Sequence, residues 1–167
     1  LVWHHPRSRI KASWRQQVWD LCWPLVRQGR IDEVIHIGVV AHHLLTFTRE
    51  MRHGSVMDQR HRELGIMMTA RAANSAYEFD HHWNHALRAG ATRAQLETLD
   101  EFETSPLFTE KERAVCRYAV EATRHIEVSD ATWAALTAAF SQREAMDLVM
   151  AVAWYNAVAR INGPLQI

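Results

Sequence analysis

The chain has 167 residues, of which 48% are hydrophobic, and its 19 basic residues balance its 19 acidic residues. This size and composition predict a single globular domain with a sizeable core. The neutral net charge argues against a nucleic-acid partner and against a polybasic membrane anchor. No apolar run reaches the roughly 18 residues needed to span a bilayer, so we also expect no membrane partner.

Helix signals are dense along the chain, and strand signals are nearly absent. Five segments have the spacing of an N-terminal capping box, in which two side chains satisfy backbone N–H groups of the first turn. These segments begin at Ser55, Ser75, Thr92, Thr109 and Ser141. Glycines suited to end helices stand at positions 29, 54 and 90. The pattern predicts an all-α bundle of seven or eight helices.

The expected helices follow one another with short connections. They cover residues 11–28, 31–52, 56–73, 76–89, 93–102, 110–125, 130–139 and 142–161. Pro24 should break or kink the first helix, and Gly163-Pro164 should end the last. Apolar residues recur at helical spacing at Trp133, Leu136 and Phe140, which predicts a core-facing stripe. Residues 145–154 are apolar almost all round, so this helix should be central or lie in a subunit interface.

Two cysteines, Cys22 and Cys116, lie far apart and outside any C-x-x-C pattern. This spacing favours reduced thiols buried as small apolar side chains, and therefore a cytoplasmic location.

The best candidate for chemistry is the segment 77–85, which holds two acids and three imidazoles in about two and a half helical turns. In a helix, Glu78, His82 and His85 share one stripe at i, i+4 and i+7. An apolar face should lie beside that stripe and place the acid and imidazole groups on the flank of the buried surface. It would consist of Phe79, Trp83, Ala86 and Leu87.

Glu63 stands 19 residues before His82, on the preceding expected helix. The turn-forming residues 73–75 should let Glu63 fold back toward His82 rather than lie several turns away along one rod.

These residues form a pattern that resembles the carboxymuconolactone decarboxylase and alkylhydroperoxidase D superfamily. The pattern is Arg62-Glu63-Leu64, then Tyr77-Glu78-Phe79-x-x-His82, then Ala86-x-x-x-Gly90. Later segments are similar to that family's C-terminal half: Thr109 to Arg113, Val128 to Asp130, and Tyr155-Asn156 through Arg160-x-Asn162. The resemblance implies a domain over residues 41–167, preceded by a helical extension over 1–40 that resembles nothing we can name.

The peroxidase branch of that superfamily uses a C-x-x-C pair, and its two positions fall here on Ser75 and Glu78. Neither Cys22 nor Cys116 is placed to replace these thiols. A thiol peroxidase needs a thiolate to attack the O–O bond and a second thiol to resolve the product, so this activity is disfavoured.

The decarboxylase branch lacks the cysteines and is the better match. The resemblance implies a cofactor-independent lyase acting on a small cyclic or unsaturated organic acid, by decarboxylation, dehydration or isomerisation. Such chemistry needs a general acid, groups that hold the carboxylate, and a dry pocket. His82 is the expected proton donor, Glu63 would orient it, and Glu78 would hold it in one tautomer. Substrate binding is expected from Arg60, Arg62, Arg71, Tyr77 and His85.

Other interpretations stay open at this point. Glu78 could only close a capping box with Ser75, Glu63 could pair with an arginine on its own helix, and His82 could be a satisfied interior histidine. A metal-dependent enzyme could use His81 and His85, with His42, His43 or Asp80 as further ligands, although we expect no metal. A non-catalytic oligomeric binding protein is a third alternative.

We expect a homo-oligomer: a dimer, trimer or hexamer. Seven Trp, the apolar last helix and the family resemblance together imply more apolar surface than one 19.3 kDa subunit would cover.

Overall fold

The structure is a computed structural model that describes residues 27–165, and these residues form seven α-helices, one short 3-10 helix and no strand. The all-α prediction is confirmed. The elements are α2 (Ile31–His53), α3 (Gln59–Ala72), α4 (Ala76–Arg88), α5 (Arg93–Glu97), η1 (Leu99–Glu101), α6 (Glu110–Arg124), α7 (Asp130–Ala139) and α8 (Gln142–Leu165). The expected first helix lies almost wholly outside the described residues, and so does Pro24.

The chain divides into two compact units, residues 1–54 and 55–167. The first unit contains α2, which ends where the Gly54 N–H donates to the Glu50 carbonyl at 2.7 Å. The second unit contains the other helices of residues 27–165 and the candidate site. Residue 40, after which the family resemblance was expected to begin, lies within α2.

Three of the five expected capping boxes are present. Each has a hydroxyl that accepts from the backbone N–H three residues later and a side chain that reaches back to the cap. They are Thr92 with Gln95, Thr109 with Glu112, and Ser141 with Glu144. These caps fix the starts of α5, α6 and α8 from local sequence alone.

The other two expected boxes are wrong. Asp58, rather than Ser55, caps α3, and its carboxylate accepts from the N–H groups of Arg60 and His61. Ser75 precedes α4 but makes no side-chain capping hydrogen bond. The carboxyl group of Glu78 is therefore not used in a cap and is available to the interior.

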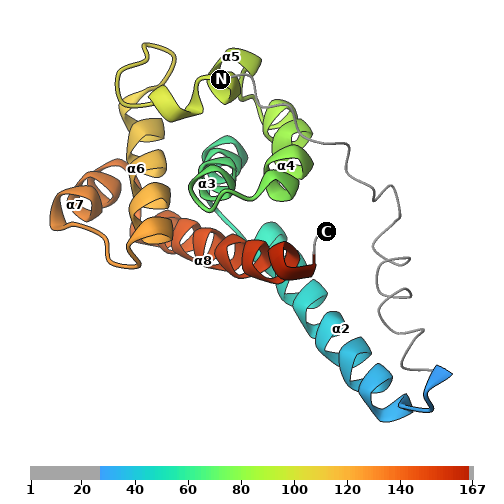
Figure 1. Ribbon diagram of the computed structural model, residues 1–167. Coiled ribbons are helices and arrows are strands. Elements are labelled where there is room, and N and C mark those ends of the chain that lie inside the picture. The colour runs from blue at the N-terminus through green and yellow to red at the C-terminus, as the bar shows by residue number, and fades with distance from the viewer. Residues whose placement is uncertain (1–26, 166–167) are drawn as a thin grey trace. The chain divides into compact units, whose positions relative to one another are not determined.

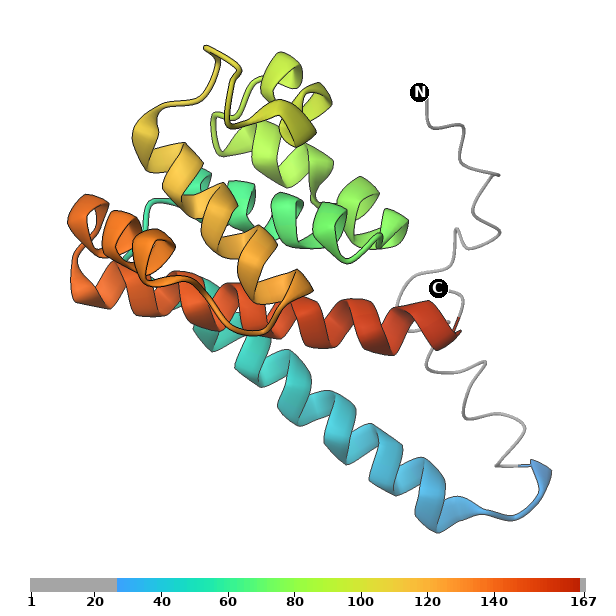
Figure 2. The same ribbon diagram turned by 60° about the vertical axis from the view of Figure 1, so that its left-hand side comes forward.

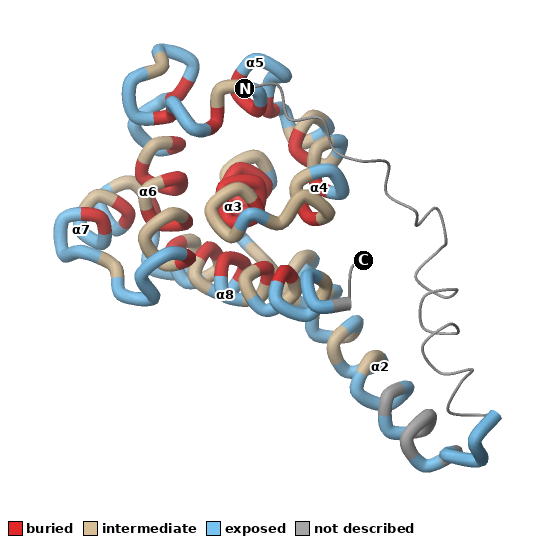
Figure 3. Tube along the Cα trace, viewed as in Figure 1, coloured by how far each residue is buried: buried red, intermediate tan, exposed pale blue. Residues whose placement is uncertain are grey.

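Helix α3 lies between α4, α6 and α8 (Figures 1 and 2) and is buried along most of its length (Figure 3). A Cβ atom on Gly65 would come within 2.6 Å of Leu148 Cδ1 and 3.3 Å of Val115 Cγ1. The absence of a side chain at Gly65 thus lets α6 and α8 approach α3 closely. Because of this packing, polar side chains on α3 must find partners on neighbouring helices.

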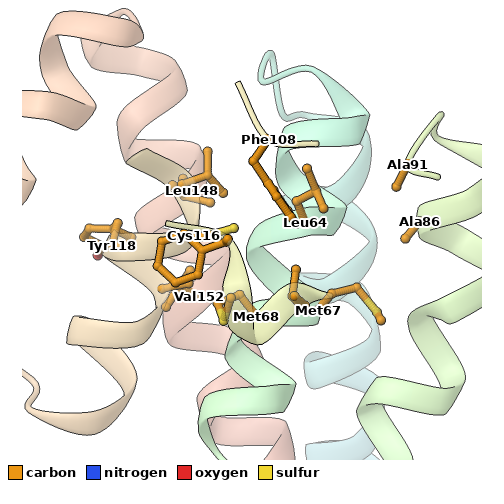
Figure 4. Close-up of a cluster of buried hydrophobic side chains, with 14 of the residues drawn as sticks. Leu64, Met67, Met68, Ala86, Ala91, Phe108, Cys116, Tyr118, Leu148 and Val152 are labelled. Atoms are coloured by element: carbon orange, nitrogen blue, oxygen red, sulfur yellow. The ribbon is translucent and has the colours of Figure 1, made fainter. Parts of the chain in front are cut away.

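The core joins α3, α4, α6 and α8 (Figure 4). Leu64, Met67, Cys116 and Leu148 are at most 2% exposed. The stripe expected on α7 is confirmed at Leu136 and Phe140. It is wrong at Trp133, which is 41% exposed and whose ring centroid lies 6.4 Å from that of Tyr118. None of the described helices has the length and apolar character needed to cross a membrane.

Two helix ends differ from expectation. Helix α5 stops at Glu97 and η1 follows, so residues 93–102 are not one α-helix. Helix α8 continues to Leu165 and includes Pro164, which was expected to end it. Proline removes one backbone donor, and so close to a helix end few further hydrogen bonds depend on it.

Candidate active site

The imidazole of His82 lies between two carboxyl groups in the interior of the second unit. Its Nδ1 is 2.8 Å from Glu63 Oε2, and its Nε2 is 3.8 Å from Glu78 Oε2. The residues Glu63, Glu78 and His82 are 0%, 3% and 1% exposed. An ionised carboxylate can only accept, so Nδ1 carries a proton when Glu63 is charged, and in the neutral imidazole Nε2 then faces Glu78 with a lone pair.

A tight turn between α3 and α4 produces this contact. The Ser75 N–H donates to the Ala70 carbonyl at 2.8 Å, and Asn74 adopts the left-handed backbone conformation with φ of 55°. The two helices fold back on each other, so Glu63 and His82 meet although they are 19 residues apart. The expectation that Glu63 folds back toward His82 is confirmed.

Helix α8 supplies two further side chains to this cluster. Asn162 Nδ2 donates to Glu78 Oε1 at 2.7 Å. The ring of Tyr155 packs nearly perpendicular to the His82 ring, with their centroids 4.6 Å apart. From the sequence we named both residues only as part of the C-terminal family pattern. Their i, i+7 spacing, which places them on one face of a helix, was the available signal.

The electrostatics of Glu78 differ from those of a surface acid. Burial raises its pKa, while the neighbouring His82 and the hydrogen bond from Asn162 act in the opposite direction without cancelling that rise. A carboxyl group with a raised pKa and partners of this kind can hold or release a proton nearer neutral pH. The interpretation that Glu78 only closes a capping box is therefore wrong.

The other α4 residues surround the cluster. The His81 and His85 rings lie with centroids 5.2 Å and 5.5 Å from that of His82. Tyr77 stacks on His81 at 5.8 Å, and burial together with the charge of Glu78 raises the pKa of its phenol. His85 and Tyr77 are thus near the cluster, as a substrate-binding role would require.

Two of the three expected arginines are engaged elsewhere. Arg60 Nη2 lies 2.6 Å from Glu112 Oε1 on α6, and it also donates to Gln95 Oε1 at 3.2 Å. Arg71 pairs with Asp100 on η1 through its Nε and Nη2 atoms. Their ion-pair partners lie outside the cluster, so the structure does not bring either cation to His82. Arg62 is 6% exposed and lies next to Glu63 in the buried stretch of α3.

Among the described residues, no group of three or more His, Cys, Asp or Glu side chains gathers in a way that could hold a metal ion. The His81, His82 and His85 rings are neighbours, but within residues 27–165 they do not form such a group.

The thiol of Cys116 lies in the core between the helices and is 0% exposed. Burial raises its pKa strongly, and the charges of Glu112 and Glu103 act in the same direction. A buried thiol that resists ionisation is a poor nucleophile. Cys22 lies outside the described residues.

A shallow groove of about 340 Å³ lies elsewhere, along α6 and α8. It is lined by Tyr118, Ala122, Ile126, Val152, Ala153, Asn156, Ala157 and Arg160. Glu63, Glu78 and His82 do not line this groove, and it has no carboxyl or imidazole group of its own. We therefore place the candidate chemistry at the buried cluster.

The described residues thus form an all-α fold whose α3–α4 hairpin carries a buried Glu–His pair. The sequence model of the "Carboxymuconolactone decarboxylase family" matches residues 40–121, which include Glu63, Glu78 and His82. This match and the AhpD-like fold support the assignment of the chain to the carboxymuconolactone decarboxylase and alkylhydroperoxidase D-like superfamily. Tyr155 and Asn162 lie beyond the matched segment.

Two solved structures have a similar fold. One is a protein of unknown function from Agrobacterium tumefaciens for which a role as the antioxidant defence protein AhpD has been suggested. It is 18% identical, with a TM-score of 0.67 over 75% of this chain and 86% of that chain. The other is the debrominase Bmp8, a cysteine-to-alanine variant in complex with 2,3,4-tribromopyrrole. It is 18% identical, with a TM-score of 0.62 over 80% of this chain and 71% of that chain.

At 18% identity these two likenesses establish the fold alone. No curated protein matches the chain.

Proposed function

We propose that this protein is a cofactor-independent enzyme that uses Glu63, His82 and Glu78 for acid/base chemistry on a small cyclic or unsaturated organic acid. Decarboxylation is the leading reaction, because the family model that matches the chain is that of carboxymuconolactone decarboxylase. The observation that carries the proposal is the 2.8 Å contact between His82 Nδ1 and Glu63 Oε2 among side chains that water barely reaches.

The proposed roles follow from the geometry of the imidazole. Glu63 holds Nδ1 and fixes the tautomer, which leaves Nε2 as the nitrogen that exchanges a proton. Glu78 Oε2 faces the same nitrogen at 3.8 Å, so the two groups can act on one substrate atom. Hydrogen bonds and charges act strongly in such a buried setting, because little water competes with them.

In the proposed decarboxylation the bond between the carboxyl carbon and its neighbour breaks and CO2 leaves. The electron pair remains on the substrate carbon, where an adjacent unsaturated carbonyl delocalises it. A proton from the pair His82 and Glu78 is then transferred to that carbon, so the substrate is neither oxidised nor reduced. His85 and Tyr77 are the proposed contacts for the substrate, from their positions beside the cluster.

A thiol peroxidase is a weaker candidate for this chain. The two positions that carry the family's thiols hold Ser75 and Glu78, and the thiol of Cys116 is buried in the core.

The test is a turnover screen with muconolactone-type acids, followed by CO2 release and by the loss of conjugated absorbance. Wild-type protein should turn over at least one such acid, and His82→Gln should lower kcat by about 10²- to 10⁴-fold. Hydroperoxide reduction is the negative control. Full activity of His82→Gln, or hydroperoxide turnover that disappears with either cysteine, would place the chemistry on other residues.

A further inference from the structure

The last helix contacts Glu78 through a residue to which the proposed function gives no role. Asn162, in the final turns of α8, donates through Nδ2 to Glu78 Oε1 at 2.7 Å. The two residues are 84 positions apart in sequence. Asn162 is half-buried, whereas Glu78 is 3% exposed, so the amide meets the carboxyl group at the edge of the interior.

The hydrogen bond from the Asn162 amide engages Glu78 Oε1 and leaves Oε2 facing His82. Oε2 lies 3.8 Å from His82 Nε2, which is longer than a hydrogen bond. The terminal torsion of a glutamate is soft and roughly two-fold, so His82 alone does not fix the carboxylate plane. A directional donor on Oε1 supplies that constraint.

We propose that Asn162 is a positioning residue of this site, whose amide fixes the Glu78 carboxylate so that Oε2 faces His82 Nε2 and stays available for proton exchange. This inference rests on the acid/base function proposed above. It assigns to α8 a part of the site that lies outside the segment matched by the family model.

The groups around Glu78 decide the direction of the expected effect. His82 and Tyr77 on α4 are its titratable neighbours, and Glu63 on α3 lies beyond His82. From α8 comes the neutral amide of Asn162, with Tyr155 against the His82 ring. The amide donates to the charged form of Glu78 and so lowers a pKa that burial raises. Loss of that donor should raise the pKa of Glu78 further.

Two variants remove the donor in different ways. Asn162→Asp keeps the shape but places a second carboxyl group against Glu78, and Asn162→Ala removes the contact altogether. Both should raise the pKa of Glu78, and Asn162→Asp more strongly, because like charges add to the lost hydrogen bond. Asn162→Gln retains an amide donor, so it should raise the pKa of Glu78 less than the other two variants do.

Asn156→Ala is the matched control. Asn156 is another half-buried asparagine on α8, and its amide donates to Thr123 Oγ1 at 2.9 Å instead of to Glu78. Asn156→Ala therefore removes a similar side-chain amide from the same helix without touching Glu78. The pKa of Glu78 should therefore be the same in Asn156→Ala as in the wild type.

The experiment is a carboxyl titration by NMR of protein labelled with ¹³C-glutamate, with Glu78→Gln used to assign the signal and circular dichroism used to check folding. We expect the Glu78 midpoint to rise in Asn162→Asp and Asn162→Ala and to stay in place in Asn156→Ala. On a muconolactone-type acid that the wild type turns over, Asn162→Ala should lower kcat on the order of 10- to 100-fold with little change in KM. In the pH profile of kcat for Asn162→Ala, the acid limb should move to higher pH.

An unchanged Glu78 midpoint in both Asn162 variants would overturn the positioning role, even where His82→Gln abolishes turnover. The proposed function fails separately. If the midpoint moves as expected while His82→Gln leaves turnover intact, Asn162 still holds Glu78 and the catalytic assignment is the error.

Discussion

Glu63 and His82 form a buried contact of 2.8 Å between α3 and α4, with 0% and 1% of the two side chains exposed. Because neither group can turn to water instead, removing one partner leaves the other polar and buried. The loss of one member of a buried pair of this kind typically costs about 3–5 kcal/mol when both are charged. This pair therefore links the stability of the α3–α4 hairpin to the proposed chemistry.

We predict that Glu63→Gln and His82→Gln affect turnover as one unit. Each should lower kcat by about 10²- to 10⁴-fold, and the double variant should be little worse than either single variant, because members of one relay fail together. Single-turnover and steady-state rates of the three variants measure this. Losses that multiply in the double variant would show that the two residues act independently.

The raised pKa of Glu78 predicts how stability depends on pH. Its folded-state pKa lies above the ordinary value of 4.5 because of burial, so the folded state binds this proton more tightly than the unfolded chain does. Its contribution to stability is fully present below pH 4.5 and is lost as pH rises through the folded pKa.

Urea unfolding of wild type and Glu78→Gln between pH 4 and 8 checks this prediction. The free energy of unfolding of wild type minus that of Glu78→Gln should fall as pH rises. Glu101→Gln, which removes one exposed carboxyl group, is the control for the change in charge. A difference that instead grows with pH would mean that Glu78 is stabilised as a carboxylate.

Arg71 is predicted to be structural. It pairs with Asp100 and lies over the Phe79 ring at 5.5 Å from the centroid, with 34% of its side chain exposed. A partly exposed pair of this kind contributes about 0.2–1 kcal/mol. Arg71→Gln should lose about that much stability in denaturant unfolding and keep the kcat and KM of wild type. A large rise in KM would return Arg71 to the substrate site.

The thiol of Cys116 should be inert in the folded protein. In a Cys22→Ser background it is the only thiol, and a thiol reagent should react with it at the rate of unfolding and not faster. Cys116→Ala should cost about 1–2 kcal/mol by leaving a small cavity, with turnover unchanged. Rapid labelling without denaturant would contradict the burial of this side chain.

The expected homo-oligomer stays a prediction, and α8 offers a surface for it. Met146 and Met150 are 44% and 43% exposed and stand one turn apart. Burying such half-exposed side chains against a second copy would contribute about 1 kcal/mol each, roughly half the value for a fully exposed side chain. Light scattering at micromolar concentration should give more than one subunit for wild type and fewer for Met150→Glu. Ala138→Glu adds the same charge at an exposed position on α7 and should leave assembly unchanged. A monomeric wild-type protein would contradict the predicted homo-oligomer.

The sequence alone determined the features that depend on neighbours within a few residues. The capping boxes at Thr92, Thr109 and Ser141 define helix starts because both of their partners lie within one turn. The turn before α4 and the spacing of Glu63 and His82 were enough to predict that these two residues meet. A helix hairpin is local, so its contacts follow from helical geometry and the position of the turn.

Only the tertiary structure decided which ion pairs and hydrogen bonds the charged side chains form. Sequence periodicity placed Glu78 and His82 on the flank of an apolar face, whereas both are buried and the rings of Phe79 and Trp83 lie partly exposed. The physical reason is that Glu63 on the buried helix α3 needs a polar partner, and α4 turns His82 toward it.

The same holds for contacts between distant segments. Arg60 and Arg71 pair with acids on α6 and η1 rather than with the cluster, and Asn162 reaches Glu78 across 84 residues. Local spacing carries no information on such pairs, because helix packing decides which side chains come within hydrogen-bond distance.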